Sequence, residues 1–171
     1  VFIKKGNFDT VVGKFAENDN IAVIPNLNGD IYPDIIIGAL GKVSVFYGDS
    51  NPANILTRDH LITGPGGSDL GIKVAYAGDV NGDTFDDIIV ADINANEVYI
   101  FAGSAAGITA VDETGAMVTF TTSDEIGEGL CGGFDLNRDG ADDVVFSEAD
   151  AAAGRIIFMP GRLGMTPGNN D

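Results

Sequence analysis

The sequence predicts an all-β fold built from repeated, four-stranded antiparallel units. Short apolar runs of alternating or β-branched residues are separated by turn residues, and 24 of the 171 residues are glycine. An acidic loop followed directly by a β-branched run occurs three times, beginning at residues 26, 79 and 135, with spacings of 53 and 56 residues. Such a period indicates one structural unit that is copied along the chain.

The expected elements follow the same order in every copy. A strand leads into each acidic loop, and the strands DIIIG, DIIVA and DVVFS lead out of it. An alternating strand closed by glycine comes next, as KVSVFYG at 42–48, EVYIFAG at 97–103 and RIIFMPG at 155–161. The fourth strand is more polar, as in ILTRDHLIT at 55–63 and MVTFTTS at 117–123. We expect neighbouring units to cover both faces of the apolar second strand, and the mixed fourth strand to lie at an outer edge.

The repeat describes the chain as a single array of units. Residues 1–15, with VFIKKG and TVVGKF, fit the last two strands of a preceding unit; residues 16–64 and 65–122 are complete units, and residues 123–171 form an incomplete one. Four strands in about fifty residues is the size of a β-propeller blade. The sequence therefore predicts about three and a half blades, with a fourth-strand donor at the N-terminus and an acceptor at the C-terminus.

Composition restricts the partners of the protein. The formal net charge of −17 makes nucleic acid and anionic membranes improbable partners, and cations the natural ones. No apolar run approaches the roughly 20 residues that span a bilayer. The one cysteine, Cys131, has no intrachain partner and is expected to be a buried structural thiol. The start at Val1, without Met or a signal pattern, indicates a processed form or a segment of a longer chain.

Each acidic loop presents oxygen atoms at alternate residues, which is a pattern that wraps a calcium ion. The predicted ligands are the side chains at loop positions 1, 3, 5 and 9 and the main-chain carbonyl at position 7. They are Asp79, Asn81, Asp83, Phe85 and Asp87 in the second loop, Asp135, Asn137, Asp139, Ala141 and Asp143 in the third, and Asn26, Asn28, Asp30, Tyr32 and Asp34 in the first. Because converging carboxylates repel one another without a cation, we expect up to three bound Ca²⁺ ions. The first loop has only two carboxylates and is the weakest candidate.

Other interpretations of the loops are also open. Asn and Asp are the usual residues of polar turns, although three copies in register favour a metal. An EF-hand begins with similar spacing, but Ile37, Val90 and Phe146 replace its bidentate Glu, and the flanking segments are strands. Magnesium fits less well because it retains water ligands. Asp86 and Asp142, which correspond to Pro33, are expected to lie behind the ligands or to face solvent.

The pattern D-x-N-x-D-x-x-x-D followed by an apolar strand, and preceded by a glycine strand such as LGIKVAYAGD, resembles the FG-GAP repeat of integrin α-subunit β-propellers. The resemblance covers nearly the whole chain, and the FG and GAP signatures survive as Leu70-Gly71, Ile126-Gly127 and Gly38-Ala39. It implies a propeller with calcium in the hairpin loops of one rim, located outside the cell or at its surface. The implied role is adhesion or recognition of a protein or carbohydrate ligand.

No catalytic set can be assembled from the sequence. His60 is the only histidine and lies on an expected outer strand, so we expect a surface residue and no enzyme. Two alternative functions are a structural protein that assembles head-to-tail, with the N-terminal strands of one copy completing the last unit of the next, and an accessory propeller of a polysaccharide-degrading enzyme.

Overall fold

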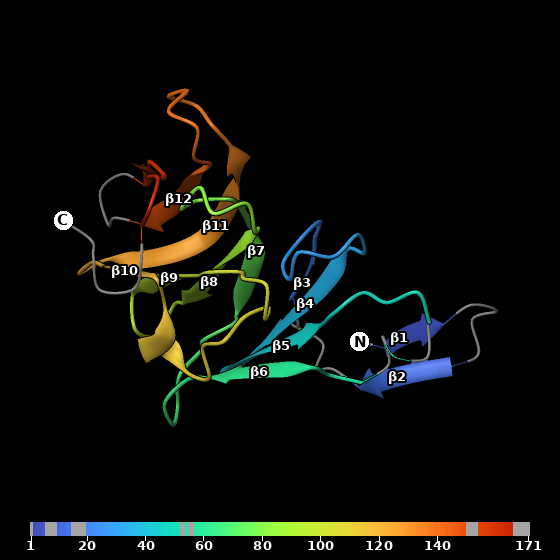
Figure 1. Cartoon of the computed structure of the whole chain (residues 1–171). Coiled ribbons are helices and arrows are strands. Elements are labelled where there is room, and N and C mark those ends of the chain that lie inside the picture. Colours follow the sequence, from blue (N-terminus) through green and yellow to red (C-terminus); the bar gives the residue numbers. More distant parts are fainter. Residues whose placement is uncertain are drawn as a thin grey trace.

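The computed structural model describes the backbone of residues 2–5 and 10–14, and the full residues 20–51, 54, 57–149 and 154–165. The prediction of an all-β chain is confirmed. Three antiparallel sheets of three or four strands make up the body of the protein, and a separate hairpin precedes them (Figure 1). Helical structure in the described residues is limited to short 3₁₀ segments, including the turn η2 at Glu113–Gly115.

The sheets follow one another in chain order. The N-terminal hairpin pairs β1 (Phe2–Lys5) with β2 (Thr10–Lys14). The first unit contains β3 (Asn20–Ile24), β4 (Asp34–Ala39), β5 (Lys42–Phe46) and β6 (His60–Thr63). The second unit contains β7 (Lys73–Gly78), β8 (Asp87–Asp92), β9 (Glu97–Phe101) and β10 (Val118–Thr121). The third unit contains β11 (Glu125–Phe134), β12 (Asp143–Ala149) and β13 (Arg155–Met159).

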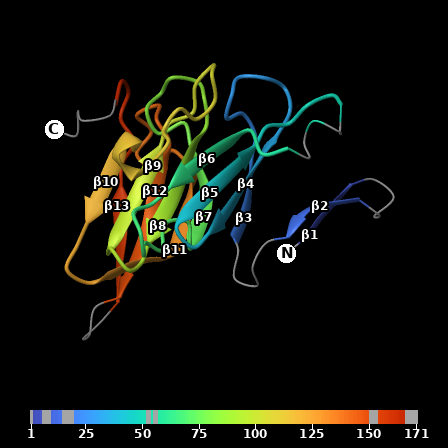
Figure 2. The same cartoon turned by 90° about the horizontal axis from the view of Figure 1, so that it is seen from below.

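Within each unit the strands pair in sequence order, so that the first and last strands form the edges. Every residue of β8 is buried, and the mixed strands β6 and β10 lie at edges, as the sequence predicts. The sheets stand side by side with their strands running in a similar direction, and the first strands β3, β7 and β11 contact one another in turn (Figure 2). No sheet of the described residues closes on itself, and β1–β2 and the third unit lie at opposite ends of the array (Figure 1).

The hydrophobic core consists of two layers, each lying between neighbouring sheets. The layer between the first and second units includes Ile36, Val43, Val45, Ile88, Val90 and Phe101. The layer between the second and third units includes Ile89, Val98, Ile100, Val144 and Phe146. Adjacent residues of β8 therefore enter different layers, which is why its sequence is apolar throughout. The burial of each unit depends on its neighbours, as in other repeat proteins.

The expectation for Cys131 is wrong, because its thiol is exposed. Cys131 pairs with Val145 in the register of β11 and β12, and the corresponding residue of the second unit, Ala75, packs in the core layer against the third unit. Its position in the repeat is therefore a packing position. It is exposed because no described sheet follows the third unit.

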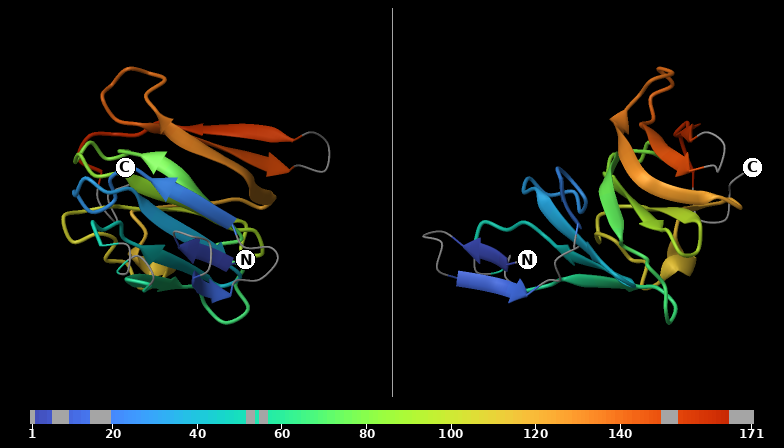
Figure 3. Two further views of the ribbon diagram at one scale, coloured as in Figure 1. Left: turned by 90° about the vertical axis from the view of Figure 1, so that its right-hand side faces the viewer. Right: turned by 180° about the vertical axis from the view of Figure 1, so that it is seen from behind.

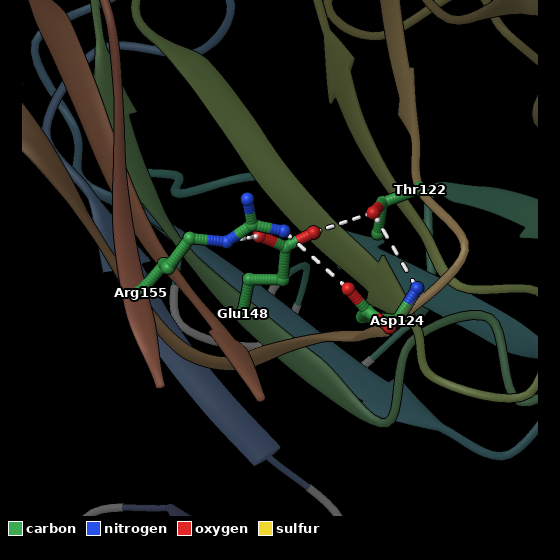
Figure 4. A network of polar contacts seen from close by, with 4 residues as sticks. All are labelled: Thr122, Asp124, Glu148 and Arg155. Carbon is green, nitrogen blue, oxygen red and sulfur yellow. Dashed lines mark hydrogen bonds and ion pairs between the residues drawn. The ribbon is translucent and has the colours of Figure 1, made fainter. Parts of the chain in front are cut away.

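A buried acidic side chain joins each of the last two units to the segment that enters it. Asp92, at the end of β8, accepts hydrogen bonds from the Ser68 hydroxyl and, at 3.1 Å, from the Asp69 N–H. Glu148 holds the corresponding place on β12 and accepts from the Thr122 hydroxyl (Figure 4). Arg155 forms ion pairs with Glu148 at 2.7 Å and with Asp124 at 3.4 Å. These contacts tie the linker between the second and third units to β12 and β13.

Tyr47 makes a further joint between units. Its hydroxyl oxygen accepts a hydrogen bond of 2.8 Å from the Ile108 N–H of the second unit. Burial raises the pKa of Tyr47, and the nearby carboxylates of Asp34 and Asp59 act in the same direction. The folded protein therefore favours the neutral phenol, so the stability that Tyr47 contributes is complete below pH of about 10 and is lost as the pH rises through its folded pKa.

We expect Tyr47→Phe to lower the free energy of unfolding at pH 7 by about 1–3 kcal/mol, because the Ile108 N–H loses its acceptor. The difference between the two proteins should shrink above pH of about 10, because the Tyr47 phenol of the unfolded wild-type chain ionises there while the folded protein holds it neutral, and the Phe variant has no such group. Urea unfolding at pH 7, 9 and 10.5 measures both effects. A difference that stays constant over this range would contradict the assignment.

Among the described residues, no helix is long and apolar enough to cross a membrane.

Candidate metal centre

The three acidic loops connect the first and second strands of the three units, and they lie on the same side of the array (Figure 3, left). The first loop spans residues 26–34, the second 79–87 and the third 135–143. Neighbouring loops touch through their backbones. The Asp86 N–H donates to the Asn26 carbonyl and the Asp142 N–H donates to the Asp79 carbonyl, each at 2.9 Å. The fold therefore gathers all fifteen predicted ligand residues along one edge.

Positions 3, 5 and 7 have the same hydrogen bonds in every loop. The amide nitrogen of the Asn at position 3 donates to the Asp at position 5, and the N–H groups of positions 5 and 7 donate to the side chains two residues earlier. These residues are Asn28, Asp30 and Tyr32 in the first loop, Asn81, Asp83 and Phe85 in the second, and Asn137, Asp139 and Ala141 in the third. The side chains at positions 3 and 5 are thus held together, with Nδ2 to Oδ2 distances of 2.8–2.9 Å.

Position 1 separates the first loop from the other two. Asp79 accepts from the N–H groups of Asp83 and Thr84 at 2.9 and 2.8 Å, and Asp135 accepts from the corresponding groups of Asp139 and Gly140 at 3.1 and 3.0 Å. Asn26 instead donates to the Thr84 carbonyl of the second loop at 3.1 Å. Its Oδ1 atom is buried and has no hydrogen-bond partner. The first loop therefore directs its first side chain towards its neighbour.

The backbone of the second and third loops is wound in the same way. Position 4 is left-handed in all three loops, with φ of 83° at Gly29, 73° at Gly82 and 64° at Arg138. Position 6 is left-handed only in the second and third loops, at Thr84 (φ 78°) and Gly140 (φ 95°). This conformation strains a β-branched residue such as Thr84. The strain accompanies the hydrogen bond from the Thr84 N–H to Asp79.

Position 9 is a fully buried aspartate in all three units. Each carboxylate accepts one N–H from position 2 of its own loop and one from the glycine that ends the third strand. Asp34 accepts from Leu27 and Gly48, Asp87 from Val80 and Gly103, and Asp143 from Leu136 and Gly161, all at 2.7–3.0 Å. These aspartates fix each loop to its own sheet. Burial raises the pKa of Asp87 to about 8, although its two N–H donors favour the ionised form and oppose the shift.

Asp86 and Asp142, which we call the bridging aspartates, connect each loop to the loop before it. The Asp86 carboxylate accepts from the Asn26 N–H at 2.7 Å and from the Tyr76 hydroxyl at 3.1 Å. The Asp142 carboxylate accepts from the Asp79 N–H at 3.0 Å. Because the N–H group of each bridging aspartate also donates to the carbonyl at position 1 of the preceding loop, the two residues exchange a pair of hydrogen bonds, which we call the latch. The sequence did not lead us to predict this role. The signal was present, since the first loop has Pro33 at this position, which has neither an N–H nor a carboxylate.

Glycine at the end of the third strand permits the same close approach. A Cβ atom at Gly103 would overlap the Asp86 and Leu27 carbonyls, and one at Gly161 would overlap those of Asp142 and Val80. The next residues, Ser104 and Arg162, donate their N–H groups to the Leu27 and Val80 carbonyls at 3.2 and 2.9 Å. The first and second loops are therefore each enclosed by the unit that follows them.

The donor set fits a hard cation in composition. The second and third loops each offer three carboxylates, one amide oxygen and one main-chain carbonyl, which are the oxygen ligands that calcium prefers. In the part of the chain that the structure describes, no three His, Cys, Asp or Glu side chains form a group placed to hold a metal ion. The carboxylates of each loop accept N–H groups of the turn instead. Metal binding would therefore require the side chains at positions 1, 3 and 5 to turn towards a shared centre.

The expectation that His60 is a surface residue is only partly right, because His60 contacts the adjoining segment of the second unit. Its Nε2 lies 2.6 Å from the Ala110 carbonyl oxygen, and the ring is half-buried on β6.

Comparison of the chain with models of known protein families gives no match, and comparison with curated protein sequences gives no significant match. The FG-GAP resemblance therefore rests on the repeated loop, its flanking strands and its glycines.

Proposed function

We propose that the protein is a calcium-binding repeat module of the FG-GAP type, whose sheets are propeller blades, and that it serves adhesion or recognition of a protein or carbohydrate outside the cell. The observation that carries the proposal is the threefold loop. Three stretches far apart in the sequence have the same hydrogen bonds at positions 3, 5, 7 and 9, and they lie along one edge. A polar turn needs no such repetition of carboxylates.

Electrostatics supports a cation at this edge. The bridging aspartates, the buried aspartates and the carboxylates at positions 1 and 5 lie in loops that contact one another, within a chain of net charge −17. Burial raises the pKa values of Asp34, Asp86 and Asp87, and neighbouring carboxylates add to each shift. A divalent cation in a loop would favour the ionised forms of these groups. The left-handed Thr84 is a second support, since strain of this kind accumulates at ligand sites.

A calcium role here is structural, and we propose no enzymatic activity. Calcium would cross-link the carboxylates of a loop that the buried aspartate already fixes to its own sheet and, in the first and second loops, that the following unit also holds. It would therefore stiffen the edge on which neighbouring units meet, and hold a fixed surface for a partner.

Isothermal titration calorimetry tests the proposal. Calcium is titrated into protein from which a chelator has removed the divalent ions. We expect at least two sites, in the second and third loops, and weaker binding or none in the first, where Asn26 points away. Asp83→Asn and Asp139→Asn should each remove one site. Glu128→Gln, which removes one charge from an exposed acid outside the loops, should leave the stoichiometry unchanged. Binding that weakens equally in all three variants would indicate a diffuse cation atmosphere and contradict the proposal.

Head-to-tail assembly is a second candidate, favoured by the exposed strand β13, which has no fourth strand among the described residues. The N-terminal strand that would complete it, β2, is already paired with β1. Assembly would therefore add a hairpin, instead of a single strand, to β13. Sedimentation velocity in millimolar calcium separates the candidates, because a recognition module stays monomeric and an assembling protein forms larger species with increasing concentration.

A further inference from the structure

Two of the three acidic loops contain an Asn-Gly pair, and the third does not. Positions 3 and 4 are Asn28-Gly29 in the first loop and Asn81-Gly82 in the second, and no other asparagine of the chain precedes a glycine. In such a pair the backbone nitrogen of the glycine can attack the side-chain amide carbon of the asparagine and close a five-membered ring. Glycine has no Cβ that hinders the closure. The third loop has Asn137-Arg138 at these positions and provides a comparison within the same fold.

The peptide nitrogen at position 4 is restrained in the third loop and not in the first two. The N–H groups of Gly29 and Gly82 donate no hydrogen bond to any described residue. The Arg138 N–H, by contrast, donates to the Asp135 carboxylate at 2.6 Å. Ring closure rotates the peptide unit between positions 3 and 4, so in the third loop this hydrogen bond has to break first. No such bond opposes the rotation in the other two loops.

The side-chain amide of Asn28 is held in a form that favours attack. Its Oδ1 accepts the Asp30 N–H at 3.1 Å, and its Nδ2 donates to the Asp30 carboxylate at 2.9 Å. An N–H that donates to the amide oxygen stabilises the negative charge that develops on this oxygen when a nucleophile adds to the carbon. The corresponding bonds are present at Asn81 and Asn137, so the amide geometry does not distinguish the three loops.

The first loop is the looser and the more open of the two Asn-Gly loops. In the second loop, Asp79 accepts the N–H groups of positions 5 and 6, whereas Asn26 accepts neither of these groups in the first loop. Gly29 is exposed and Asn28 is half-buried, whereas Asn81 is only 6% exposed. Fewer hydrogen bonds therefore resist rotation of the peptide in the first loop, and water reaches it more readily.

We propose that Asn28 is a modification site, at which spontaneous deamidation places a third carboxylate in the first loop. The Gly29 nitrogen bonds to Cγ of Asn28, the bond from Cγ to Nδ2 breaks, and the proton of the Gly29 N–H leaves with Nδ2 as ammonia. Water then opens the succinimide ring. Cleavage of the bond from nitrogen to Cγ yields aspartate at position 28, and cleavage of the bond from nitrogen to the main-chain carbonyl carbon yields isoaspartate. Water is the only co-reactant.

The aspartate product changes the first loop more than it would change the others. Together with Asp30 and Asp34 it would give this loop three carboxylates, as many as the second and third loops have now. The first loop would thus gain the charge that a calcium ligand set requires. Isoaspartate would instead lengthen the main chain by one methylene group before Gly29. This consequence rests on the proposed calcium function, whereas the modification itself does not.

The rate of deamidation at each asparagine tests the proposal. The full chain is kept in EGTA in mildly alkaline buffer, with and without urea, and peptide mapping by mass spectrometry follows Asn28, Asn81 and Asn137. In urea, Asn28 and Asn81 should react at similar rates, because only the local sequence then acts. In the native protein we expect Asn28 to react at least about fivefold faster than either of the others, since its loop opens most easily. Equal native rates at Asn28 and Asn81, or no native reaction at Asn28, would overturn the proposal.

Arg138→Gly is the matched variant, because it creates an Asn-Gly pair in the third loop and keeps the N–H that donates to Asp135. We expect Asn137 of the native variant to react at least about fivefold more slowly than Asn28, because the hydrogen bond still opposes rotation. A rate equal to that of Asn28 would mean that the local sequence alone decides, and would overturn the structural assignment. Asn28→Gln cannot close the five-membered ring and should abolish the product at this position.

Asn28→Asp tests the consequence for calcium separately. Calorimetric titration should show calcium binding to the first loop at least about fivefold more tightly than in the unreacted chain, because affinity rises with the number of carboxylate ligands. Unchanged affinity, with the three asparagines reacting in the expected order, would overturn the calcium consequence alone. Absence of calcium binding in all three loops would contradict the proposed function and would leave the modification site in place.

Discussion

Removal of calcium with EGTA is expected to lower the melting temperature of the protein by roughly 5–11 °C for each site that is lost. An ion that binds only the native state at a hundredfold excess over its Kd contributes about 2.7 kcal/mol. For a chain of this size, one kcal/mol shifts the melting temperature by about 2–4 °C. Two occupied sites, in the second and third loops, would therefore produce one of the largest stability changes available to this protein.

The structure indicates why the loss should spread beyond the loops. The second loop contacts the first through Asp86 and the third through Asp142, so a loop that loosens also weakens the latch to its neighbour. Each core layer lies between two sheets. A weaker latch therefore weakens the apolar packing of both sheets that share the layer.

Calorimetry in calcium and in EGTA measures the shift. Sodium chloride at equal ionic strength controls for screening of the net charge, and magnesium at the same concentration controls for any divalent cation. The Asp83→Asn, Asp139→Asn double variant should lose most of the calcium-dependent shift, whereas Glu128→Gln should keep it. A melting temperature that is the same in calcium and in EGTA would contradict calcium binding by the loops.

The local pattern of the sequence was sufficient to predict the strands. The β-branched run after each loop and the glycine after each third strand lie where the structure has them, because alternation and turn chemistry depend on residues close in sequence. The mixed composition of β6 and β10 likewise indicated their edge positions.

Contacts between units could not be predicted in the same way. Cysteine is among the residue types that are most often buried, yet the exposure of Cys131 depends on whether another sheet covers the third unit. The latch of Asp86 and Asp142 joins residues about sixty positions apart, and no local rule relates them. The buried aspartates were predicted as ligands from their spacing, but spacing alone does not reveal the two N–H donors that meet each of them.

Asp87→Ala is expected to lower the free energy of unfolding by about 2–6 kcal/mol, measured by urea unfolding in EGTA so that calcium plays no part. The substitution leaves two buried N–H groups, those of Val80 and Gly103, without acceptors, at about 1–3 kcal/mol each. The Val80 N–H lies in the second loop and the Gly103 N–H at the end of β9. Loss of the carboxylate therefore separates the loop from its own sheet.

Asp83→Ala is the matched control, because it removes a carboxylate from the same loop at an exposed position. It should cost less than about 1.5 kcal/mol, since its hydrogen bond with the Phe85 N–H is exposed and that donor can reach water. Asp87→Asn should fall between the two, because the amide keeps one acceptor oxygen and turns an NH₂ group towards the second donor. Equal costs for Asp83→Ala and Asp87→Ala would mean that the buried aspartate acts only as one more acid of the loop. A large cost for Asp87→Ala alone would establish that position 9 has a structural task with or without a metal, and would explain why all three units keep an aspartate there while position 1 varies.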